Sequence, residues 1–242
     1  YMLVEVCVSS MPSIKSAATA GADRIELCSA LELGGLTPSA GFIRQALDLN
    51  ILPIHCLIRP RQGHFFYSSE EITLIEQNIK NANLLGCQGV VVGMHNNKFK
   101  LDIPLLKKWK SLAGSMFITF HRAFDLLINP EESLEQLIEL GFDCVLTSGQ
   151  NENAIDGINN LKSWNEKFGL QINIMPGGGI GIDNCKIFKA AGLSSIHLSG
   201  SKIINPIKIP KEVNKELSFL NQPLKDSDTN ILRQVVQSFK FS

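Results

Sequence analysis

Four segments of the sequence repeat one pattern, in which a glycine ends a helix-like stretch and a strand-like run begins two to four residues later. The segments are AGADRIELC, LGCQGVVVG, LGFDCVLTSG and AGLSSIHLSG, and their glycines are Gly21, Gly86, Gly141 and Gly192. Glycine suits this place because a helix commonly ends in a left-handed residue, a conformation that glycine adopts without strain. The recurrence indicates that strands alternate with helices along the chain.

Four further strand-like runs complete a set of eight. They are LVEVCV, IHCLIR, MFITFH and QINIMP, and the last three follow breakers at Pro53, Gly114 and Gly169. Strands that alternate with helices pair in parallel, because each crossover helix returns the chain to the same end of the sheet. An open doubly wound sheet is the alternative. The four-fold recurrence favours a closed (β/α)8 TIM barrel, with residues 1–242 as a single domain.

The segment 201–228 interrupts this pattern. It contains several prolines and lysines and no clear periodicity. We predict a long irregular loop there, followed by a last helix that begins near Asp228 or Thr229. Connections of this length are usually functional, at an interface or disordered.

Alternation along each strand assigns its two faces. The outward face packs on the helices and should be apolar, which selects Val4, Val6, Ile25, Leu27, Ile54, Cys56, Ile58, Ile118, Phe120, Ile172, Ile174, Ile196 and Leu198. The inward set is then Glu5, Cys7, Glu26, Cys28, His55, Arg59, Thr119, His121, Asn173, Met175, His197 and Ser199. Branched apolar side chains usually fill such interiors, so this one is unusually polar.

Charged groups inside a barrel need partners, because burying an unpaired charge is costly. One interpretation is a polar network in which Glu5, Glu26, Arg24, Arg59 and the histidines satisfy one another. The other is a binding site, because this fold places its active site at the carboxyl ends of the strands.

The predicted carboxyl ends of the strands carry groups that suit an anion. Three arginines follow strands there, and the glycine-rich turns after the last two barrel strands are where barrels commonly bind phosphate. The predicted anion-binding set is Arg59, Arg61, Arg122, Gly177, Gly178, Gly179, Ser199 and Gly200.

Acid and base chemistry needs a proton carrier near neutrality and a second group that positions it. His121 with Asp125 or Glu26 could supply both, and Glu5 is a further carboxylate on the inward face. If the chain is an enzyme, its predicted catalytic residues are therefore Glu5, Glu26, His121 and Asp125.

Two thiols occupy equivalent places on the first two strands. Cys7 and Cys28 each follow a glutamate by two residues, on strands expected to lie about 4.8 Å apart. Neighbouring thiols suit a soft ion, Cu(I) above all, with histidine or methionine as further ligands. The other cysteines, Cys56, Cys87, Cys144 and Cys185, are expected on outward or helix-facing positions as small apolar residues.

The totals exclude several function classes. The 23 basic and 23 acidic residues balance, so the chain shows no electrostatic signature of a nucleic-acid binder. No apolar run approaches the roughly 18 residues of a membrane span. No HExxH, Walker, GxSxG or CxxC motif occurs, and no organic cofactor is expected. Without a recognisable secretion signal, the six cysteines are expected to be reduced thiols in the cytoplasm.

Several motifs resemble one family. EVCVSS, GADRIELCSALELGGLTPS, IRPRQGHFFYS, TFHRAFD, LGFDCVLTSGQ and MPGGGI are similar, in order, to motifs of the CutC family of copper homeostasis proteins. The resemblance implies a cytoplasmic (β/α)8 barrel that forms a homodimer or larger assembly. It also implies Cu(I) binding, with Cys7 and Cys28 as the candidate ligands. Some relatives have a further cysteine where this chain has Leu198, and the chain beyond residue 201 resembles the family poorly.

Three functions follow from the sequence. The leading hypothesis is a copper homeostasis protein that binds Cu(I) through Cys7 and Cys28. The alternative is a TIM-barrel enzyme that applies acid and base chemistry to a small anionic or phosphorylated metabolite. A third is a scaffold that only presents the segment 201–228. The expected partner is a copper ion or a small anion, without nucleic acid or membrane.

Overall fold

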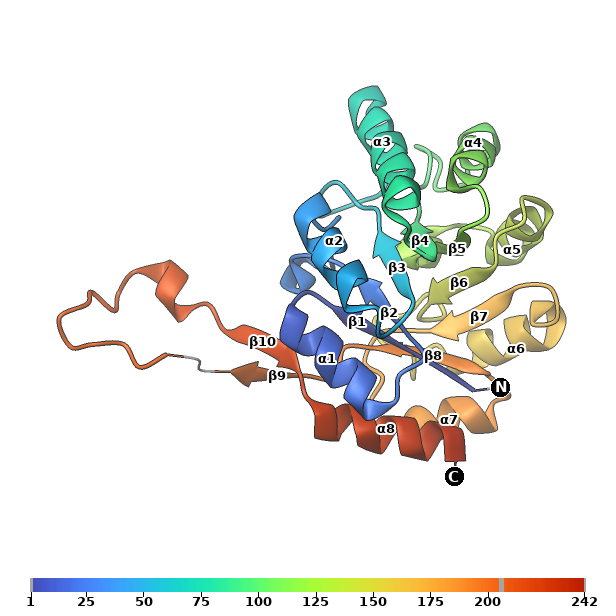
Figure 1. Ribbon diagram of the computed structural model, residues 1–242. Helices are drawn as coiled ribbons and strands as arrows, with labels where there is room; N and C mark the ends of the chain where they lie inside the picture. The colour runs from blue at the N-terminus through green and yellow to red at the C-terminus, as the bar shows by residue number, and fades with distance from the viewer. Residues whose placement is uncertain (1, 205–206, 242) are drawn as a thin grey trace.

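Eight parallel strands form the centre of the computed structural model, which describes residues 2–204 and 207–241 (Figure 1). The strands are β1 (Leu3–Val8), β2 (Arg24–Leu27), β3 (Ile54–Leu57), β4 (Gly89–Val92), β5 (Phe117–Phe120), β6 (Cys144–Thr147), β7 (Asn173–Pro176) and β8 (Ser195–Leu198). Their order is β7-β6-β5-β4-β3-β2-β1-β8. A single parallel bridge between Gly177 and His197 joins the two ends of this sheet. The predicted (β/α)8 barrel is confirmed.

Helices follow the strands and surround the barrel (Figure 1). They are α1 (Met11–Ala20), α2 (Ala40–Leu49), α3 (Ser69–Leu85), α4 (Ile103–Ala113), α5 (Pro130–Glu139), α6 (Ile158–Phe168), α7 (Cys185–Ala190) and α8 (Thr229–Phe241). Gly21 and Gly86 end α1 and α3 in the left-handed conformation, as their repeated pattern predicts. Within the described ranges, no helix combines the length and the apolarity that a membrane crossing needs.

The outward face of the strands is apolar, as alternation predicts. Every residue of the predicted outward set belongs to the large apolar cluster that also contains residues of the helices, such as Trp109 and Phe239. Two small clusters lie apart from it, one of Cys7, Cys28, Leu57 and Val91, the other of Cys144, Leu146 and Met175. The outward expectation for Cys144 is therefore wrong, because alternation along β6 turns Val145 outward and Cys144 inward.

Gly89 of β4 and Gly93 directly after it make room for two imidazole rings, one on β3 and one directly after β5. A Cβ atom at Gly89 would lie 2.6 Å from the ring of His55 on β3, and one at Gly93 would overlap the ring of His121 after β5. Real Cβ atoms essentially never approach other atoms so closely. The spacing of the glycines in GVVVG thus places two bulky polar rings inside the barrel.

A ribbon of two antiparallel strands, β9 (Ser201–Ile204) and β10 (Leu224–Ser227), lies where we predicted an irregular loop. Residues 205 and 206 of that segment lie outside the described residues. The base of the ribbon is fastened to the start of α1, where Ser13 donates a hydrogen bond of 3.0 Å to Asp226 and accepts one of 2.9 Å from the Ser227 amide. Asp228 accepts hydrogen bonds from two amides of the first turn of α8, so the predicted helix start is confirmed.

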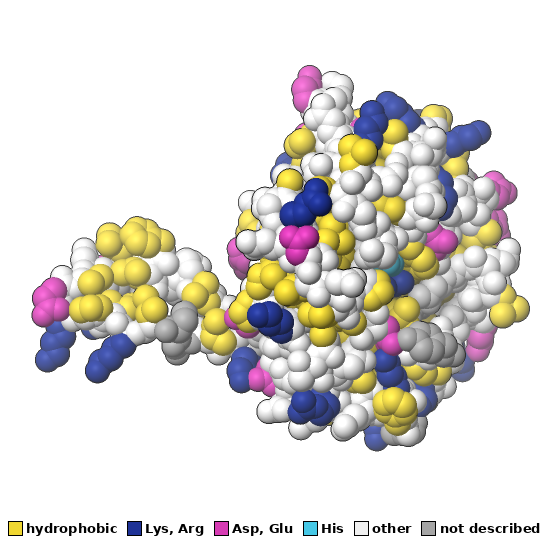
Figure 2. All heavy atoms as spheres, in the orientation of Figure 1, with side chains coloured by type: hydrophobic (Ala, Val, Ile, Leu, Met, Phe, Trp, Pro, Cys, Tyr) yellow, Lys and Arg dark blue, Asp and Glu magenta, His cyan; other side chains and the backbone are white. Residues whose placement is uncertain are grey.

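The ribbon and residues 207–223 project from the barrel as an arm (Figure 1). Apolar side chains gather on this arm (Figure 2), including Ile207 and Phe219, each 70% exposed. The arm therefore carries apolar surface that the barrel itself does not cover.

The fold predicts a penalty for any side chain at Gly89. The substitution Gly89→Ala should destabilise the protein by about 1–3 kcal/mol, because its methyl group would force the His55 ring out of place. Denaturant-induced unfolding measures this free energy. Gly41→Ala in α2 is the control, since a Cβ atom there meets nothing within 4 Å and alanine favours a helix. Equal free energies of unfolding for Gly89→Ala and Gly41→Ala would contradict the close packing of His55 against Gly89.

Candidate functional site

A cavity of about 910 Å³ opens at the carboxyl ends of the strands. Residues that follow or end β1, β2, β3, β5, β7 and β8 line it, and the ribbon contributes a further wall through Ile204, Leu224, Lys225 and Asp226. The predicted site residues that line it are Cys7, Glu26, Arg59, His121, Arg122, Gly177, Gly178, Gly179 and Ser199. Glu5, Cys28, Arg61, Asp125 and Gly200 are not among the lining residues.

A buried ion-pair network lies beneath this cavity, around Glu5. One carboxylate oxygen of Glu5 accepts a hydrogen bond of 2.5 Å from Arg24 Nε, and the other lies 2.8 Å from His197 Nδ1. Burial raises the pKa of Glu5, but Arg24 and His197 outweigh it and hold this pKa well below its usual range. Glu5, Arg24 and His197 therefore satisfy one another, as expected if the interior is a polar network.

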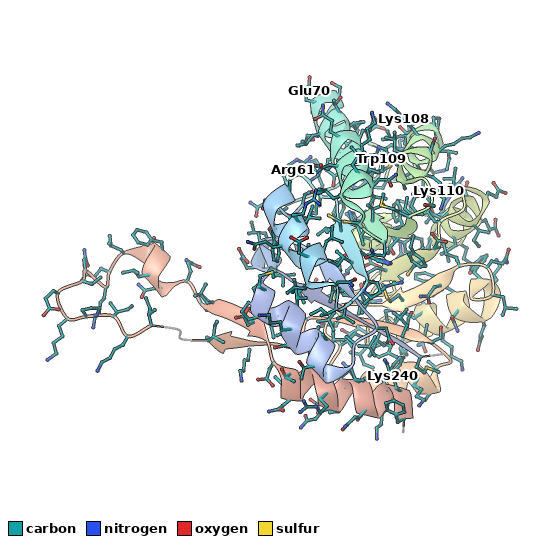
Figure 3. The ribbon with its side chains drawn as sticks, in the orientation of Figure 1. Arg61, Glu70, Lys108, Trp109, Lys110 and Lys240 are labelled. Carbon is teal, nitrogen blue, oxygen red and sulfur yellow. The ribbon has the colours of Figure 1, made fainter. Side chains whose placement is uncertain are left out.

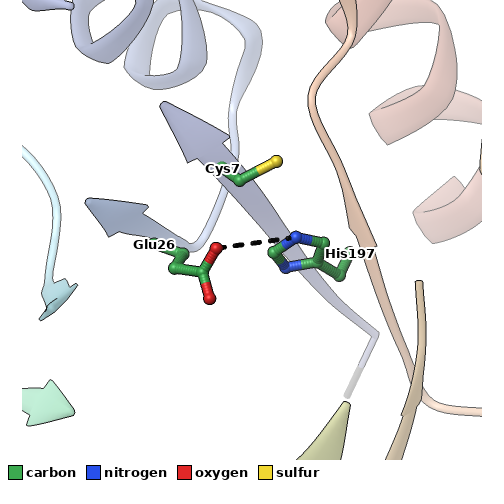
Figure 4. A group of neighbouring side chains, drawn as sticks. All are labelled: Cys7, Glu26 and His197. Carbon is green, nitrogen blue, oxygen red and sulfur yellow. Dashed lines mark ion pairs between the residues drawn. The ribbon is translucent and has the colours of Figure 1, made fainter. Parts of the chain in front are cut away.

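Strand register brings together three side chains of types that can bind a metal ion. Cys7 of β1 is level with Glu26 of β2, and Glu5 is level with His197 of β8. One ligand atom from each of Cys7, Glu26 and His197 lies within 4.8 Å of the others (Figure 4). The three residues supply a thiol, a carboxylate and an imidazole.

Electrostatic coupling ties this trio together. Burial raises the pKa of Glu26 to about 7; Glu5 adds to this rise, while His197 and Arg24 oppose it. Burial lowers the pKa of His197, but Cys7, Glu26 and Glu5 outweigh it and raise this pKa well above the usual histidine value. His197 Nε2 lies 3.8 Å from a Glu26 oxygen. The imidazole therefore bridges the Glu5 network and the cavity.

The donor set fits a metal ion. A histidine that binds a metal usually donates its other ring N–H to a carboxylate, which fixes the tautomer and orients the ring. His197 has this arrangement, because Glu5 holds Nδ1 while Nε2 faces the group with Cys7 and Glu26. A thiol and an imidazole are ligands that copper accepts.

Cys28 differs from its expected position. The register sets it two residues beyond the level of Cys7, with its amide bonded to the Val8 carbonyl. Its thiol lies 3.4 Å from the same carbonyl oxygen, and burial raises its pKa well above the usual cysteine value. Cys7 and Cys28 still belong to one small buried cluster. Cys28 thus lies nearer the carboxyl ends of the strands than Cys7 and outside the group of Cys7, Glu26 and His197.

The structure does not bring His121 and Asp125 together as an acid-base pair. Asp125 forms an ion pair of 2.8 Å with Arg122 and accepts hydrogen bonds from the Ser148 amide and hydroxyl. Burial and the nearby Arg59 charge lower the pKa of His121 to about 3. Its Nδ1 accepts a hydrogen bond of 3.1 Å from the Ala123 amide, so a neutral ring carries its proton on Nε2.

The three predicted arginines have different partners. Arg61 pairs with Glu71 at 2.5 Å and lies near α3 (Figure 3). Arg122 lines the cavity but pairs with Asp125. Arg59 lines the cavity and has no carboxylate partner among the described residues.

The glycine-rich turn after β7 lines the cavity, with Gly178 and Gly179 in left-handed conformations. Ser199 after β8 lines it too. Gly200 has a different role, since a Cβ atom there would overlap the side chain of Leu232 in α8. It permits close packing of the last helix on the barrel.

Alternation predicts that His197 lies inside the barrel, but no sequence pattern selects it as a metal ligand. The signal that could have selected it is its inward position on the strand that closes the barrel beside β1. Arg24 is equally central, and its alternation with Ile25 also turns it inward.

A model of the CutC family matches residues 2–202. The chain belongs to the CutC family. It is 41% identical over 209 residues to a protein of Aliivibrio fischeri named family protein CutC, covering 85% of this chain and 84% of that protein. A Vibrio cholerae protein of the same name is 43% identical over 199 residues, covering 81% and 78%.

A solved structure of this family has the same fold. It is the crystal structure of a candidate copper homeostasis protein CutC from Streptococcus agalactiae, with a TM-score of 0.78 and 29% identity. The match covers 82% of this chain and 99% of the CutC chain from Streptococcus. Both the sequence and the fold therefore place this chain in the CutC family, and the relative from Streptococcus is named for copper homeostasis.

The Glu5 network predicts a large loss of stability when its carboxylate is neutralised. Glu5→Gln should cost about 3–5 kcal/mol, because Arg24 would stay buried without a counterion. Chemical unfolding measures the change. Glu166→Gln is the control, since its ion pair with Lys162 is exposed and its loss should cost less than about 0.5 kcal/mol.

The effect of Glu5→Gln should also depend on pH. The pKa of Glu5 is lower in the folded than in the unfolded state, so the ionised carboxylate stabilises the fold at neutral pH. This stabilisation is complete above the unfolded pKa of about 4.5 and is lost as the pH falls below it. If the difference in free energy of unfolding between wild type and Glu5→Gln grew as the pH fell, the lowered pKa of Glu5 would be contradicted.

Proposed function

We propose that this chain binds Cu(I) at the mouth of its barrel and takes part in copper homeostasis, with Cys7 and Cys28 as thiolate ligands. The observation that carries the proposal is the group of Cys7, His197 and Glu26, whose ligand atoms lie within 4.8 Å of one another. The name of the relative from Streptococcus agalactiae, a candidate copper homeostasis protein, supports copper as the ion.

We expect these residues to have different roles in binding the ion, because their ligand atoms differ in chemistry. A soft ion prefers thiolate and imidazole to carboxylate, so Cys7 and His197 Nε2 are the expected first contacts. Cys28 supplies a second thiolate once its sulfur leaves the Val8 carbonyl. Glu26 adds negative charge beside a cationic ion, and copper is the cargo of the site.

Substitution of the ligands should weaken Cu(I) binding in a graded order. Cys7→Ser should lower the affinity by more than about tenfold, and His197→Gln should also lower it. Cys28→Ser should have the smaller effect if Cys28 joins only after rearrangement. Titration of the reduced protein against a chromogenic Cu(I) chelator measures each affinity.

Cys185→Ser is the matched control for this titration, because Cys185 lies in α7 and belongs to the outer apolar cluster. It should bind Cu(I) as wild type does. If the double variant Cys7→Ser/Cys28→Ser competes with the chelator as well as wild type, the thiol site is wrong.

A second function is favoured by the volume of the cavity. An ion fills little of about 910 Å³, whereas small organic ligands occupy pockets of about 300–1,000 Å³. We therefore also propose an enzyme that acts on a small anionic or phosphorylated metabolite, with Glu26 and His197 as proton carriers. His121 would then contribute a hydrogen bond instead of a proton transfer.

A thermal-shift screen tests the second function. A metabolite present at 100 times its Kd should stabilise the fold by about 2.7 kcal/mol. The screen should use phosphorylated and carboxylated compounds on the metal-free chain. The absence of a shift with every compound would count against an enzyme of this class.

The proposal includes a cytoplasmic location and a homodimer or larger assembly. All six cysteines are free, which suits a reducing compartment. Light scattering of the purified chain tests the assembly, and the mass of a single chain would contradict it.

A further inference from the structure

Arg59 is a buried cation without a counterion. It is 8% exposed and lines the cavity, and no described carboxylate lies within 4.0 Å of its nitrogen atoms. Arg61 and Arg122 each have an acidic partner, so Arg59 is the exception among the three arginines of the rim. A buried charge of this kind usually has a partner or binds an ion of opposite charge.

The fold fixes the guanidinium in position. Its Nη1 donates hydrogen bonds to the carbonyls of Leu33 and Gly35, and its Nη2 donates to that of Gly63. Gly34 leaves space for it, since a Cβ atom there would lie 2.9 Å from Nη1. Nε has no acceptor in the described chain. The Nε–H of this rigidly held cation is thus buried without an acceptor.

His121 adds a second N–H without an acceptor. It is 5% exposed, and the hydrogen bond from the Ala123 amide to Nδ1 leaves the proton on Nε2. Within the described ranges Nε2 has no hydrogen-bond partner. Buried N–H groups of this kind are rare and costly, and they usually have a partner that satisfies them.

The ring of Phe65 connects the two groups. Its centroid lies 5.0 Å from the Arg59 guanidinium carbon and 4.8 Å from the centroid of the His121 ring. All three residues line the cavity. The backbone of Phe65 is held by His95 through two hydrogen bonds, and its side chain is half-buried.

We infer that Arg59 and His121 form an oxyanion-binding subsite in the wall of the cavity, which takes the carboxylate or phosphate group of a small organic molecule. The Phe65 ring turns aside to admit the anion, which then accepts hydrogen bonds from Arg59 Nε and His121 Nε2. The inference rests on the second proposed function only for the class of ligand, and it requires neither turnover nor copper.

The subsite gives the cavity two chemically different ends. Arg59 and His121 provide a cation and a neutral donor, while Cys7, Glu26 and His197 provide nucleophilic and ionisable groups. A molecule anchored by its oxyanion would present its remaining atoms to the second group. This arrangement suits a small acid or phosphate ester better than a large or uncharged ligand.

Binding of simple anions to the metal-free full-length chain tests the subsite. Inorganic phosphate and acetate are the probes, chloride at equal ionic strength is the reference, and calorimetry gives each Kd. Nitrogen-15 NMR of labelled histidines reports on His121 directly. We expect phosphate, acetate or both to bind and to shift the His121 Nε2 signal, and their relative Kd values distinguish a phosphate site from a carboxylate site.

Variants then identify the groups that bind the anion. Arg59→Gln and His121→Phe should each weaken binding at least tenfold, and Arg59→Lys should be intermediate because it keeps the charge and loses the planar fork. Arg233→Gln in α8 is the control, since Arg233 is exposed and does not line the cavity, and it should bind as wild type does. Phe65→Ala should bind at least as tightly as wild type.

Two results would overturn the subsite. One is an unchanged His121 signal with both probes in the wild-type protein, which decides the question even if a variant fails to fold. The other is wild-type affinity in Arg59→Gln and His121→Phe. If phosphate binds through these residues while the metabolite screen fails, the subsite stands and the enzyme proposal falls.

Discussion

The ion pair between Glu5 and Arg24 is the interaction on which the interior of this barrel depends. Glu5 is fully buried on β1, and it is held ionised by Arg24 from β2 and by His197 from β8. A slip of one residue in either pairing would turn the partner to the outer, apolar face. Glu5, Arg24 and His197 together therefore favour one register for β8, β1 and β2.

This register also orients the side chains of the mouth. Because Glu5 holds His197 by Nδ1, the ring presents Nε2 to Cys7 and Glu26. Negative charge on Glu5 also raises the pKa of Glu26, which lies one step further along the interior. Glu5 thus raises the pKa values of Glu26 and His197, although it does not line the cavity itself.

Alternation along single strands was enough to predict the two faces of the barrel and the polar interior. It could not predict the offset between neighbouring strands. In the structure Cys7 lies level with Glu26, whereas we expected it level with Cys28. The β9–β10 ribbon was missed because its strands are short and mostly exposed, so no apolar alternation marks them. The pairing of Arg61 with Glu71 depends on how a loop folds back onto α3, and no local pattern encodes it.

The cavity combines a part that lies within the family match and a part that lies beyond it. The family match ends at residue 202, after every residue of the Glu5 network and of the Arg59 subsite. Ile204, Leu224, Lys225 and Asp226 lie beyond that match and form the wall contributed by the ribbon. This wall is anchored through Asp226 and Ser227 to the start of α1, directly after the strand that carries Cys7. The groups that we propose to bind an ion or an anion therefore come from the matched barrel, whereas the ribbon forms part of the wall that limits the shape of a ligand.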